Sequence, residues 1–248
     1  MENMPSVLSM ALGAGETSLI NLTSAYASFV NGGKKVKPSL IDRIQDRRGK
    51  NIFLENFAAC TNCDEPYIEE NPMPKLVNSS ERIFDEAKSY QMVSILKGAV
   101  DRGTGRKTKI DGIEIAGKTG TTNNNTDAWF IGFTSDLIIG VYAGFDKPKS
   151  LGKRETGSSV AVPIFRDFVK NYYQEKPILP FTIPNGIELI KINYDTGEIA
   201  SNFNSSESVY EAFSKSDNLV SSGEILVGSE GFQIIEVVDE VMEEYVIY

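Results

Sequence analysis

The chain has 248 residues, 41% of them hydrophobic, with a net charge of -9 and no histidine. This length and hydrophobic content are enough for one large domain, or for one domain with a smaller companion. The acidic balance argues against nucleic acid as a partner, and the lack of histidine excludes Ser-His-Asp catalysis, Cys-His catalysis and most zinc sites within the chain.

The first quarter of the chain predicts a helix, a hairpin and a loop. A helix is expected over residues 18–31, because apolar residues share one helical face: Leu19, Leu22, Ala25, Tyr26 and Phe29. The glycine pair that follows is typical of a helix end. Residues 37–55 are interpreted as two short strands around the turn Arg47-Arg48-Gly49. Residues 56–80, rich in proline and acidic residues, predict a long surface loop.

This predicted loop contains both cysteines of the chain, Cys60 and Cys63. A Cys-x-x-Cys pair can be a redox motif, half of a zinc site or a small-loop disulfide. A zinc site needs two more ligands, and the chain has no histidine and no further cysteine. A structural disulfide or an idle thiol pair is therefore favoured over redox catalysis, and no metal or cofactor is expected.

A second helix is predicted over residues 84–105, with Asp85 near its start and Gly103 and Gly105 at its end. Its apolar face is formed by Tyr90, Val93, Leu96 and Val100.

Three apolar strands are predicted next, over residues 113–120, 127–134 and 137–146. A tight turn at Ser135-Asp136 makes the last two an antiparallel hairpin. Their almost continuous apolarity implies burial on both faces, and the helix expected over residues 160–174 would cover one of them.

The character of the chain changes after the segment "KPILPFTIP", residues 176–184. Residues 187–201 predict another hairpin, and an acidic tail runs to Tyr248. We therefore expect one domain over residues 1–178 and a small β-rich appendage with the acidic tail over residues 179–248. No signal peptide and no membrane segment are expected, because no apolar run reaches the roughly 18 residues that a spanning helix needs.

The segment "GKTGTT" contains the chain's strongest candidate site. Lys118 supplies a positive charge at a strand end, and the hydroxyls of Thr119 and Thr121 lie on one side of an extended strand, where they can bind a carboxylate. Gly120 lets a ligand backbone approach closely, and the strand edge offers N–H donors for an oxyanion. A bare Lys-Thr-Gly is more often only a strand end with a solvated lysine.

The surroundings of this motif resemble the serine penicillin-binding proteins, in which Lys-Thr-Gly is the third active-site motif. Three further blocks are similar to class A, bifunctional members and occur in the same order: "LSMALGAGETSLINLTSAYASFVNGGKKVKPSLIDRIQD", "YQMVSILKGAVDRGTG" and "TGSSVAVPIFRDF". The resemblance covers residues 6–190. It implies an α/β (α+β type) fold, the C-terminal part of the penicillin-binding/β-lactamase-like serine transpeptidase fold, with an antiparallel sheet flanked by helices.

The resemblance also implies a reaction, the D-Ala-D-Ala transpeptidation that cross-links peptidoglycan in the cell wall. A serine attacks the donor peptide and forms an acyl-enzyme, and an amine of a neighbouring strand resolves it. β-Lactams mimic the donor and trap the serine. The implied partners are peptidoglycan stem peptides and β-lactams, and the implied location is the periplasmic side of the inner membrane in the parent protein.

The residues that match the family's third motif receive roles by this resemblance. Lys118 is the motif lysine, and Thr119 and Thr121, on either side of Gly120, would bind the donor's terminal carboxylate. The N–H of Thr121 would supply half of the oxyanion hole.

Two further positions match the family close to this motif. They are Asp127 and Trp129, which we interpret as support for the strand.

The family's other two motifs, Ser-x-x-Lys with the nucleophile and Ser-x-Asn, precede the block "ALGAGET". Within this chain, Ser-x-x-Lys spacing recurs at Ser94 and Ser150, and Ser216-Asp217-Asn218 has the Ser-x-Asn pattern. Ser94 falls in a helix that the family has beside a separate nucleophile, Ser150 falls in a loop, and Ser216 follows Lys118. The catalytic serine and its lysine are therefore expected to be absent from this chain.

Several interpretations follow from this expectation. The chain is a truncated gene product, one half of a split gene, an excerpt of a longer protein, or a product with a misplaced start. Its function is that of a transpeptidase fragment active only with the missing N-terminal half, a non-catalytic module that binds cell-wall peptides, or that of a decayed remnant. Loss of the helices with the first two motifs would expose one side of the sheet, so aggregation or dependence on a partner is expected.

Overall fold

The computed structural model divides the chain into two compact units, Met1–Ile187 and Glu188–Tyr248. It describes residues 7–8, 10, 13, 15–55, 58–61, 75–78, 80–199, 208–215, 227–228 and 231–232. In these residues, no helix is long and apolar enough to cross a membrane.

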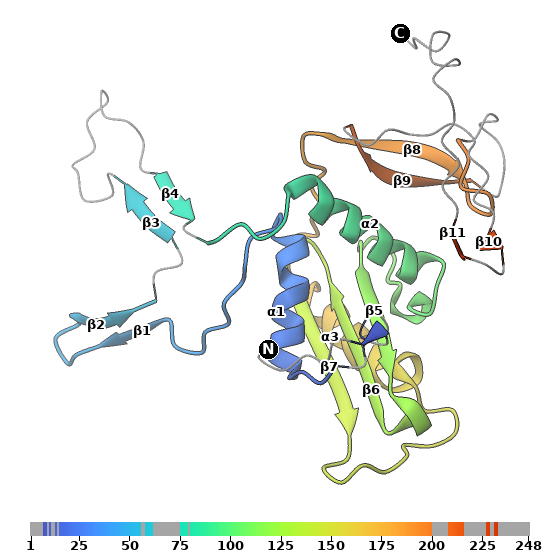
Figure 1. Ribbon diagram of the computed structural model, residues 1–248. Helices are drawn as coiled ribbons and strands as arrows, with labels where there is room; N and C mark the ends of the chain where they lie inside the picture. The colour runs from blue at the N-terminus through green and yellow to red at the C-terminus, as the bar shows by residue number, and fades with distance from the viewer. Residues whose placement is uncertain are drawn as a thin grey trace. The chain divides into compact units, whose positions relative to one another are not determined.

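The centre of the first unit is an antiparallel sheet with the strand order β5-β6-β7 (Figure 1). The strands are β5 (Ala116–Thr121), β6 (Asp127–Phe133) and β7 (Ile138–Gly144). β5 and β6 pair without a bulge, and β6 and β7 pair from end to end around the turn at residues 134–137. The three predicted strands and the predicted antiparallel hairpin are confirmed.

Helices pack on both faces of this sheet. The helix α1 (Leu19–Val30) packs on one face, where a Cβ on Gly140 would lie 2.9 Å from Leu19 Cδ1. On the other face, a Cβ on Gly132 would lie 2.7 Å from the Phe165 ring of α3 (Val162–Tyr172). α1 covers β6 and β7 on its face of the sheet, and α2 contacts β5; that the chain aggregates or depends on a partner stays a prediction.

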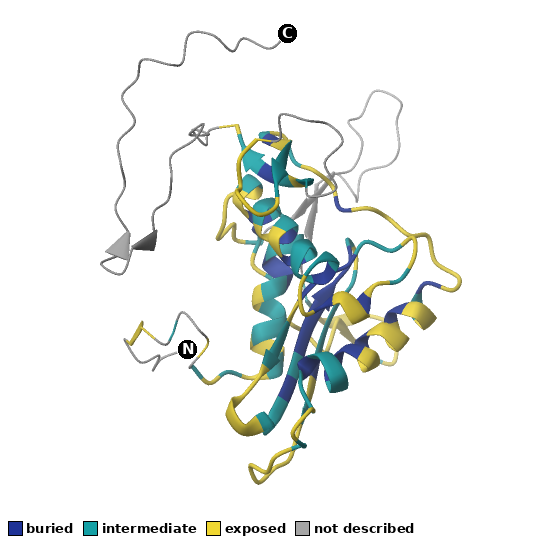
Figure 2. Cartoon of the chain, turned by 90° about the vertical axis from the view of Figure 1, so that its right-hand side faces the viewer, coloured by how far each residue is buried: buried dark blue, intermediate teal, exposed yellow. Residues whose placement is uncertain are grey.

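The core of this unit lies between the sheet and its helices (Figure 2). Phe130 of β6 and Phe165 of α3 are fully buried, with ring centroids 4.9 Å apart in an edge-to-face arrangement. Aromatic pairs prefer this geometry, and they contribute stabilisation beyond their buried area. The predicted cover of the sheet by the helix over residues 160–174 is thereby confirmed. The helix is preceded by one π-helical turn, η4 (Gly157–Ala161).

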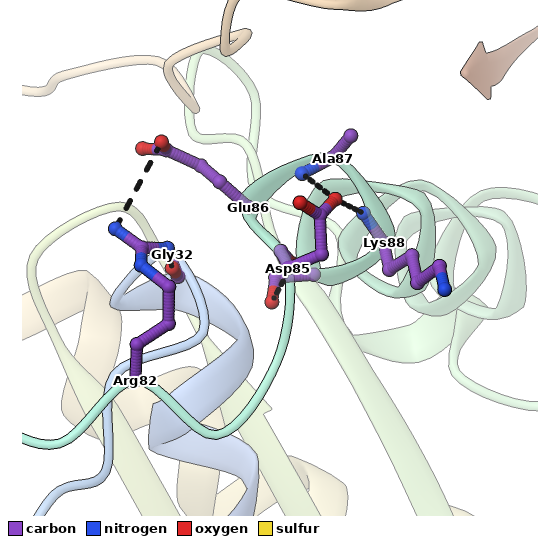
Figure 3. A network of polar contacts seen from close by, with 7 residues as sticks. Gly32, Arg82, Asp85, Glu86, Ala87 and Lys88 are labelled. Atoms are coloured by element: carbon purple, nitrogen blue, oxygen red, sulfur yellow. Dashed lines mark hydrogen bonds and ion pairs between the residues drawn. The ribbon is translucent and has the colours of Figure 1, made fainter. Parts of the chain in front are cut away.

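The helix α2 (Glu86–Asp101) packs against β5. Its N-cap is Asp85, whose carboxylate accepts hydrogen bonds from the N–H groups of Ala87 and Lys88 (Figure 3). An N-cap of this kind satisfies N–H groups that have no partner within the helix. Of the predicted face, Val93, Leu96 and Val100 are buried and Tyr90 is half-buried. This part of the sequence prediction is confirmed.

The end of α1 is joined to the segment before α2. The Arg82 guanidinium donates a hydrogen bond to the carbonyl oxygen of Gly32, and it lies 4.0 Å from the Glu86 carboxylate (Figure 3). Gly33 has a φ of +82°, and a Cβ there would collide with the carbonyl oxygen of Phe84. Only glycine fits this close approach, which explains the glycine pair at the end of the predicted helix.

The predicted apolar face of α1 is partly wrong. Ala25 is exposed, whereas Ala27 and Ser28 are the buried residues of this helix. The helix contacts both the sheet and α2, so burial follows two neighbours rather than one apolar stripe.

The segment between α1 and α2 contains two strand pairs. The strands β1 (Arg43–Gln45) and β2 (Asn51–Leu54) form the predicted hairpin, and every residue in them is exposed. The loop predicted over residues 56–80 is wrong in part, because β3 (Ala58–Thr61) pairs with β4 (Lys75–Asn78). These short stretches flank the proline-rich part and are free of proline themselves, so their backbones can form a ladder. Cys63, on which the cysteine prediction depends, lies outside the described residues.

The second unit contains β9 (Ser208–Ser214), β10 (Val227–Gly228) and β11 (Gly231–Phe232), and β8 (Ile187–Asn193) pairs with β9. The hairpin predicted over residues 187–201 is therefore only partly right. The Asn193 side chain accepts hydrogen bonds from two backbone N–H groups of the turn after β8. In the described residues beyond this turn, the chain pairs back onto β8 through a single β-bridge, between Ile192 and Ile199. The acidic tail over residues 233–248 lies outside the described residues.

Candidate functional site

The Lys118–Thr121 segment occupies the exposed half of β5, an edge strand of the described sheet. The first half of β5 is buried, and a Cβ on Gly117 would lie 2.7 Å from the carbonyl oxygen of Ile131. β5 therefore has one end fixed in the core and one end open to solvent.

Lys118 lies on one face of β5, and Thr119 and Thr121 lie on the other, because side chains alternate along a regular strand. The Lys118 ammonium donates a 2.9 Å hydrogen bond to the carbonyl oxygen of the next residue, Thr119. This bond uses one of the three donors of the ammonium group. The remaining two are available along the open edge.

The hydroxyl of Thr119 is paired with a residue outside the predicted site. Its Oγ1 lies 2.7 Å from Oγ1 of Thr104, which follows the last turn of α2. One proton is shared between the two oxygens, so one O–H of the pair can still donate to a ligand.

The hydroxyl of Thr121 is held from the same face by η4. The N–H of Gly157 donates a 3.0 Å hydrogen bond to Thr121 Oγ1. The hydroxyl acts as acceptor in this bond and keeps its own proton as a donor. A Cβ on Gly157 would lie 2.6 Å from the carbonyl oxygen of Gly120, so the contact requires glycine.

The turn between β5 and β6 is organised by Asp127. Its carboxylate accepts hydrogen bonds from the hydroxyls of Tyr142, Thr122 and Thr126 at 2.8, 3.0 and 3.1 Å. The bond from Tyr142, together with those from the two threonines, holds the pKa of Asp127 below its usual value. The same bond raises the pKa of Tyr142, because it favours the protonated phenol. Asp127 thus fixes the turn that follows Thr121.

Trp129 lies opposite Gly120 on β6, and its ring packs against Tyr142 at a centroid distance of 4.8 Å. A Cβ on Gly120 would approach Trp129 Cβ to 3.2 Å, so the indole occupies the space that a side chain at position 120 would need. Both Asp127 and Trp129 therefore lie beside the end of β5, and their supporting role stays a prediction.

Ser94 does not have a suitable base in Lys97. The Lys97 ammonium is paired with the Glu114 carboxylate, so it is already engaged as a donor to another partner. Burial alone would raise the pKa of Glu114, but the hydrogen bonds from Lys97 and the Phe181 N–H, with the lysine's charge, lower it.

Ser150 lies in an exposed loop, where its Oγ accepts a 3.2 Å bond from the N–H of Gly152. Ser216-Asp217-Asn218 falls outside the described residues.

Sequence reasoning missed three contributors to this site: Thr104, Tyr142 and Gly157. The position of Tyr142 could have been predicted, because counting outward along both strands from the turn at Ser135-Asp136 places it opposite Trp129. Gly157 and Thr104 carry no such signal, because they meet β5 only through the packing of η4 and of the segment after α2.

Comparison with known proteins gives a family match and a set of relatives. Residues 4–170 match the family described as penicillin binding protein transpeptidase domain. Penicillin-binding protein 1A of Rickettsia conorii is 47% identical over 199 residues, which cover 78% of this chain and 25% of that protein. Penicillin-binding protein 1A of Neisseria gonorrhoeae is 38% identical over 185 residues, 74% of this chain and 21% of the relative. The chain thus spans about a quarter of the length of these relatives.

Solved structures of penicillin-binding proteins have a similar fold. Penicillin-binding protein 1A from Haemophilus influenzae superposes with a TM-score of 0.66 at 28% identity, covering 82% of this chain and 33% of that one. The penicillin-binding protein PonA1 from Mycobacterium tuberculosis superposes with a TM-score of 0.59 at 21% identity, covering 74% and 45%, and shows the shared fold. The predicted fold class is confirmed.

Proposed function

This chain belongs to the penicillin-binding protein transpeptidase family, and we propose that it supplies the carboxylate-binding wall of a D-Ala-D-Ala transpeptidase cleft. In the parent protein, this wall would hold the peptidoglycan stem peptide during cross-linking, on the periplasmic side of the inner membrane. β-Lactams would occupy the same wall, since they mimic the donor peptide.

The observation that supports the proposal is the set of donors along the edge of β5. The Lys118 ammonium and the hydroxyls of Thr119 and Thr121 each have a partner that fixes them. The ammonium and the Thr121 hydroxyl each keep a proton for a ligand, and the Thr104–Thr119 pair keeps one between its two hydroxyls. Hydrogen bonds to an ionised group contribute about 1.5–3 kcal/mol each, more than bonds between neutral groups. A peptide that ends in a free carboxylate can accept from these donors while its backbone runs along the strand edge.

We further propose that the nucleophilic serine belongs to a part of the parent protein outside these 248 residues. This rests on the engaged state of Lys97 beside Ser94 and on the loop position of Ser150. The chain by itself would then bind the donor peptide without turning it over, which unites the transpeptidase hypothesis with that of a binding module.

Binding is tested by titrating the chain with diacetyl-L-Lys-D-Ala-D-Ala and with its C-terminal amide, followed by NMR. The wild type should prefer the free carboxylate, and Thr121→Val should reduce that preference by about ten- to a hundredfold, the loss of one charge-assisted hydrogen bond. Thr196→Val is the matched control, because its exposed hydroxyl contacts Glu198 in the turn after β8. Equal binding of the two peptides by the wild type would contradict the proposed function.

The nucleophile is tested separately with a fluorescent penicillin and a denaturing gel. We expect no covalent label on the chain alone. A label that survives denaturation would show that a serine of this chain is reactive, and mapping it would decide between Ser94, Ser150 and others.

A further inference from the structure

We propose that Thr104 is a positioning residue of the carboxylate site, acting through the hydroxyl of Thr119. The inference rests on the proposed function and adds to it a residue from a different element. It starts from the 2.7 Å contact between the two hydroxyl oxygens, which come from positions 15 residues apart.

The backbone around Thr104 is held tightly against the last turn of α2. The N–H of Gly105 donates a 3.0 Å hydrogen bond to the carbonyl oxygen of Ala99, and the N–H of Thr108 donates one of 2.8 Å to the carbonyl oxygen of Gly105. A Cβ on Gly103 would lie 2.8 Å from the same Ala99 oxygen. The two glycines that end α2 therefore let the chain fold back onto the helix, and Thr104 between them has a fixed position.

The Thr119 side of the contact is fixed as well. Thr119 stands opposite Phe130 in the β5–β6 register, and Phe130 is fully buried. A hydroxyl hydrogen rotates freely unless a partner orients it. With both backbones fixed, the Thr104–Thr119 contact is the feature that selects the direction of the Thr119 proton.

The hydrogen bond between Thr104 and Thr119 can run in either direction, and one of the two directions favours anion binding. When Thr104 donates to Thr119, the Thr119 proton points away from Thr104 and is free for a carboxylate. Chains of hydrogen bonds polarise one another, so the bond accepted from Thr104 makes Thr119 a better donor. Without the Thr104 hydroxyl, Thr119 keeps its place but loses this orientation and polarisation.

The test uses the 248-residue chain and the same pair of peptides, carboxylate and amide. Thr104→Val removes the hydroxyl at nearly constant shape, and Thr104→Ser keeps it. Thr104 is exposed, so neither substitution should unfold the chain, which the denaturation midpoint verifies. We expect Thr104→Val to weaken binding of the carboxylate peptide by roughly three- to tenfold, which is the net contribution of one hydrogen bond. Binding of the amide peptide should be unchanged. Thr104→Ser should restore wild-type affinity.

A double-mutant cycle tests whether Thr104 acts through Thr119. The variant with both Thr104→Val and Thr119→Val should bind no more weakly than Thr119→Val alone. Additive losses, equal losses for both peptides, or unchanged binding by Thr104→Val would each overturn the inference. If the wild type itself fails to prefer the carboxylate, the proposed function fails and the inference falls with it; a wild-type preference that Thr104→Val leaves intact overturns the inference alone.

Discussion

The two ends of β6 carry similar polar networks with different surroundings. At one end, Asp127 accepts hydrogen bonds from Tyr142 and two threonines, and Tyr142 is exposed. At the other end, Asp136 in the turn after β6 accepts from Tyr173 and from Thr134. There, Tyr173 and Thr134 are buried, and their hydroxyl oxygens lie 2.6 Å apart.

The difference shows how context assigns a role to the same three residue types. Tyr173 follows α3, so the Asp136 network joins a helix to the sheet, and its loss leaves the buried hydroxyl of Thr134 short of a partner. Tyr142 lies on β7, so the Asp127 network joins neighbouring strands at an exposed turn beside Lys118–Thr121. Water can replace the partners of the Asp127 network, whereas near Asp136 it reaches the exposed carboxylate but not the buried hydroxyls. We therefore expect the first to govern stability and the second to govern the site.

The largest effect should come from removing the packing that brings α3 to the sheet. Phe165→Ala leaves a cavity beside Phe130 and should lower the free energy of unfolding by about 3–5 kcal/mol. Phe168→Ala is the matched control on the same helix, because Phe168 is 54% exposed and should cost about 1 kcal/mol or less. Urea denaturation measures both. Equal losses would mean that the outer face of α3 is buried by a contact with another molecule.

A smaller effect should distinguish the two tyrosines. Tyr173→Phe leaves the buried hydroxyl of Thr134 short of a partner, whereas water can reach the exposed carboxylate of Asp136, so we expect a loss of about 1–2 kcal/mol. Tyr142→Phe removes an exposed bond and should cost about 0.5 kcal/mol or less. The same denaturation series compares the two. A larger loss for Tyr142→Phe would reverse the assignment of the two networks.

The smallest effects should be seen in the pH dependence of stability. Asp127 has a lowered pKa, so its contribution is complete above its ordinary value of 3.8 and is lost as the pH falls through the folded value. Burial, and then the bond to Asp136, raise the pKa of Tyr173 from 10.0 to about 12. Its contribution is therefore complete below pH 10 and is lost as the pH rises toward 12.

Free energies of unfolding measured from pH 3 to pH 12 check this assignment. Asp127→Asn should flatten the acid limb of the stability curve and, because it removes the bond that raises the pKa of Tyr142, a small part of the alkaline limb. Tyr173→Phe should flatten only the alkaline limb. An alkaline limb as steep in Tyr173→Phe as in the wild type would contradict the role of Tyr173, because only the smaller contributions of tyrosines such as Tyr142 should remain.

The local elements of this protein follow from short-range patterns in its amino-acid sequence. The Asp85 cap, the apolar spacing of α2 and the turn at Ser135-Asp136 depend on residues within a few positions of one another, so their physical causes are visible in the chain. The same holds for the Lys-Thr-Gly segment at a strand edge. The resemblance to known proteins then supplied the family and the expected chemistry.

The tertiary structure decided what surrounds that segment. Thr104 reaches Thr119 across 15 residues and Gly157 reaches Thr121 across 36, and neither contact has a local signal. The exposure of Ala25 and the pairing of β8 with β9 were also outside the reach of periodicity. Such contacts depend on where two separate elements pack, which is set by side-chain volumes and close backbone approaches summed over the whole core. Short-range patterns therefore predict the strand with the donors Lys118, Thr119 and Thr121. The partners that orient the two threonines, Thr104 and Gly157, depend on packing.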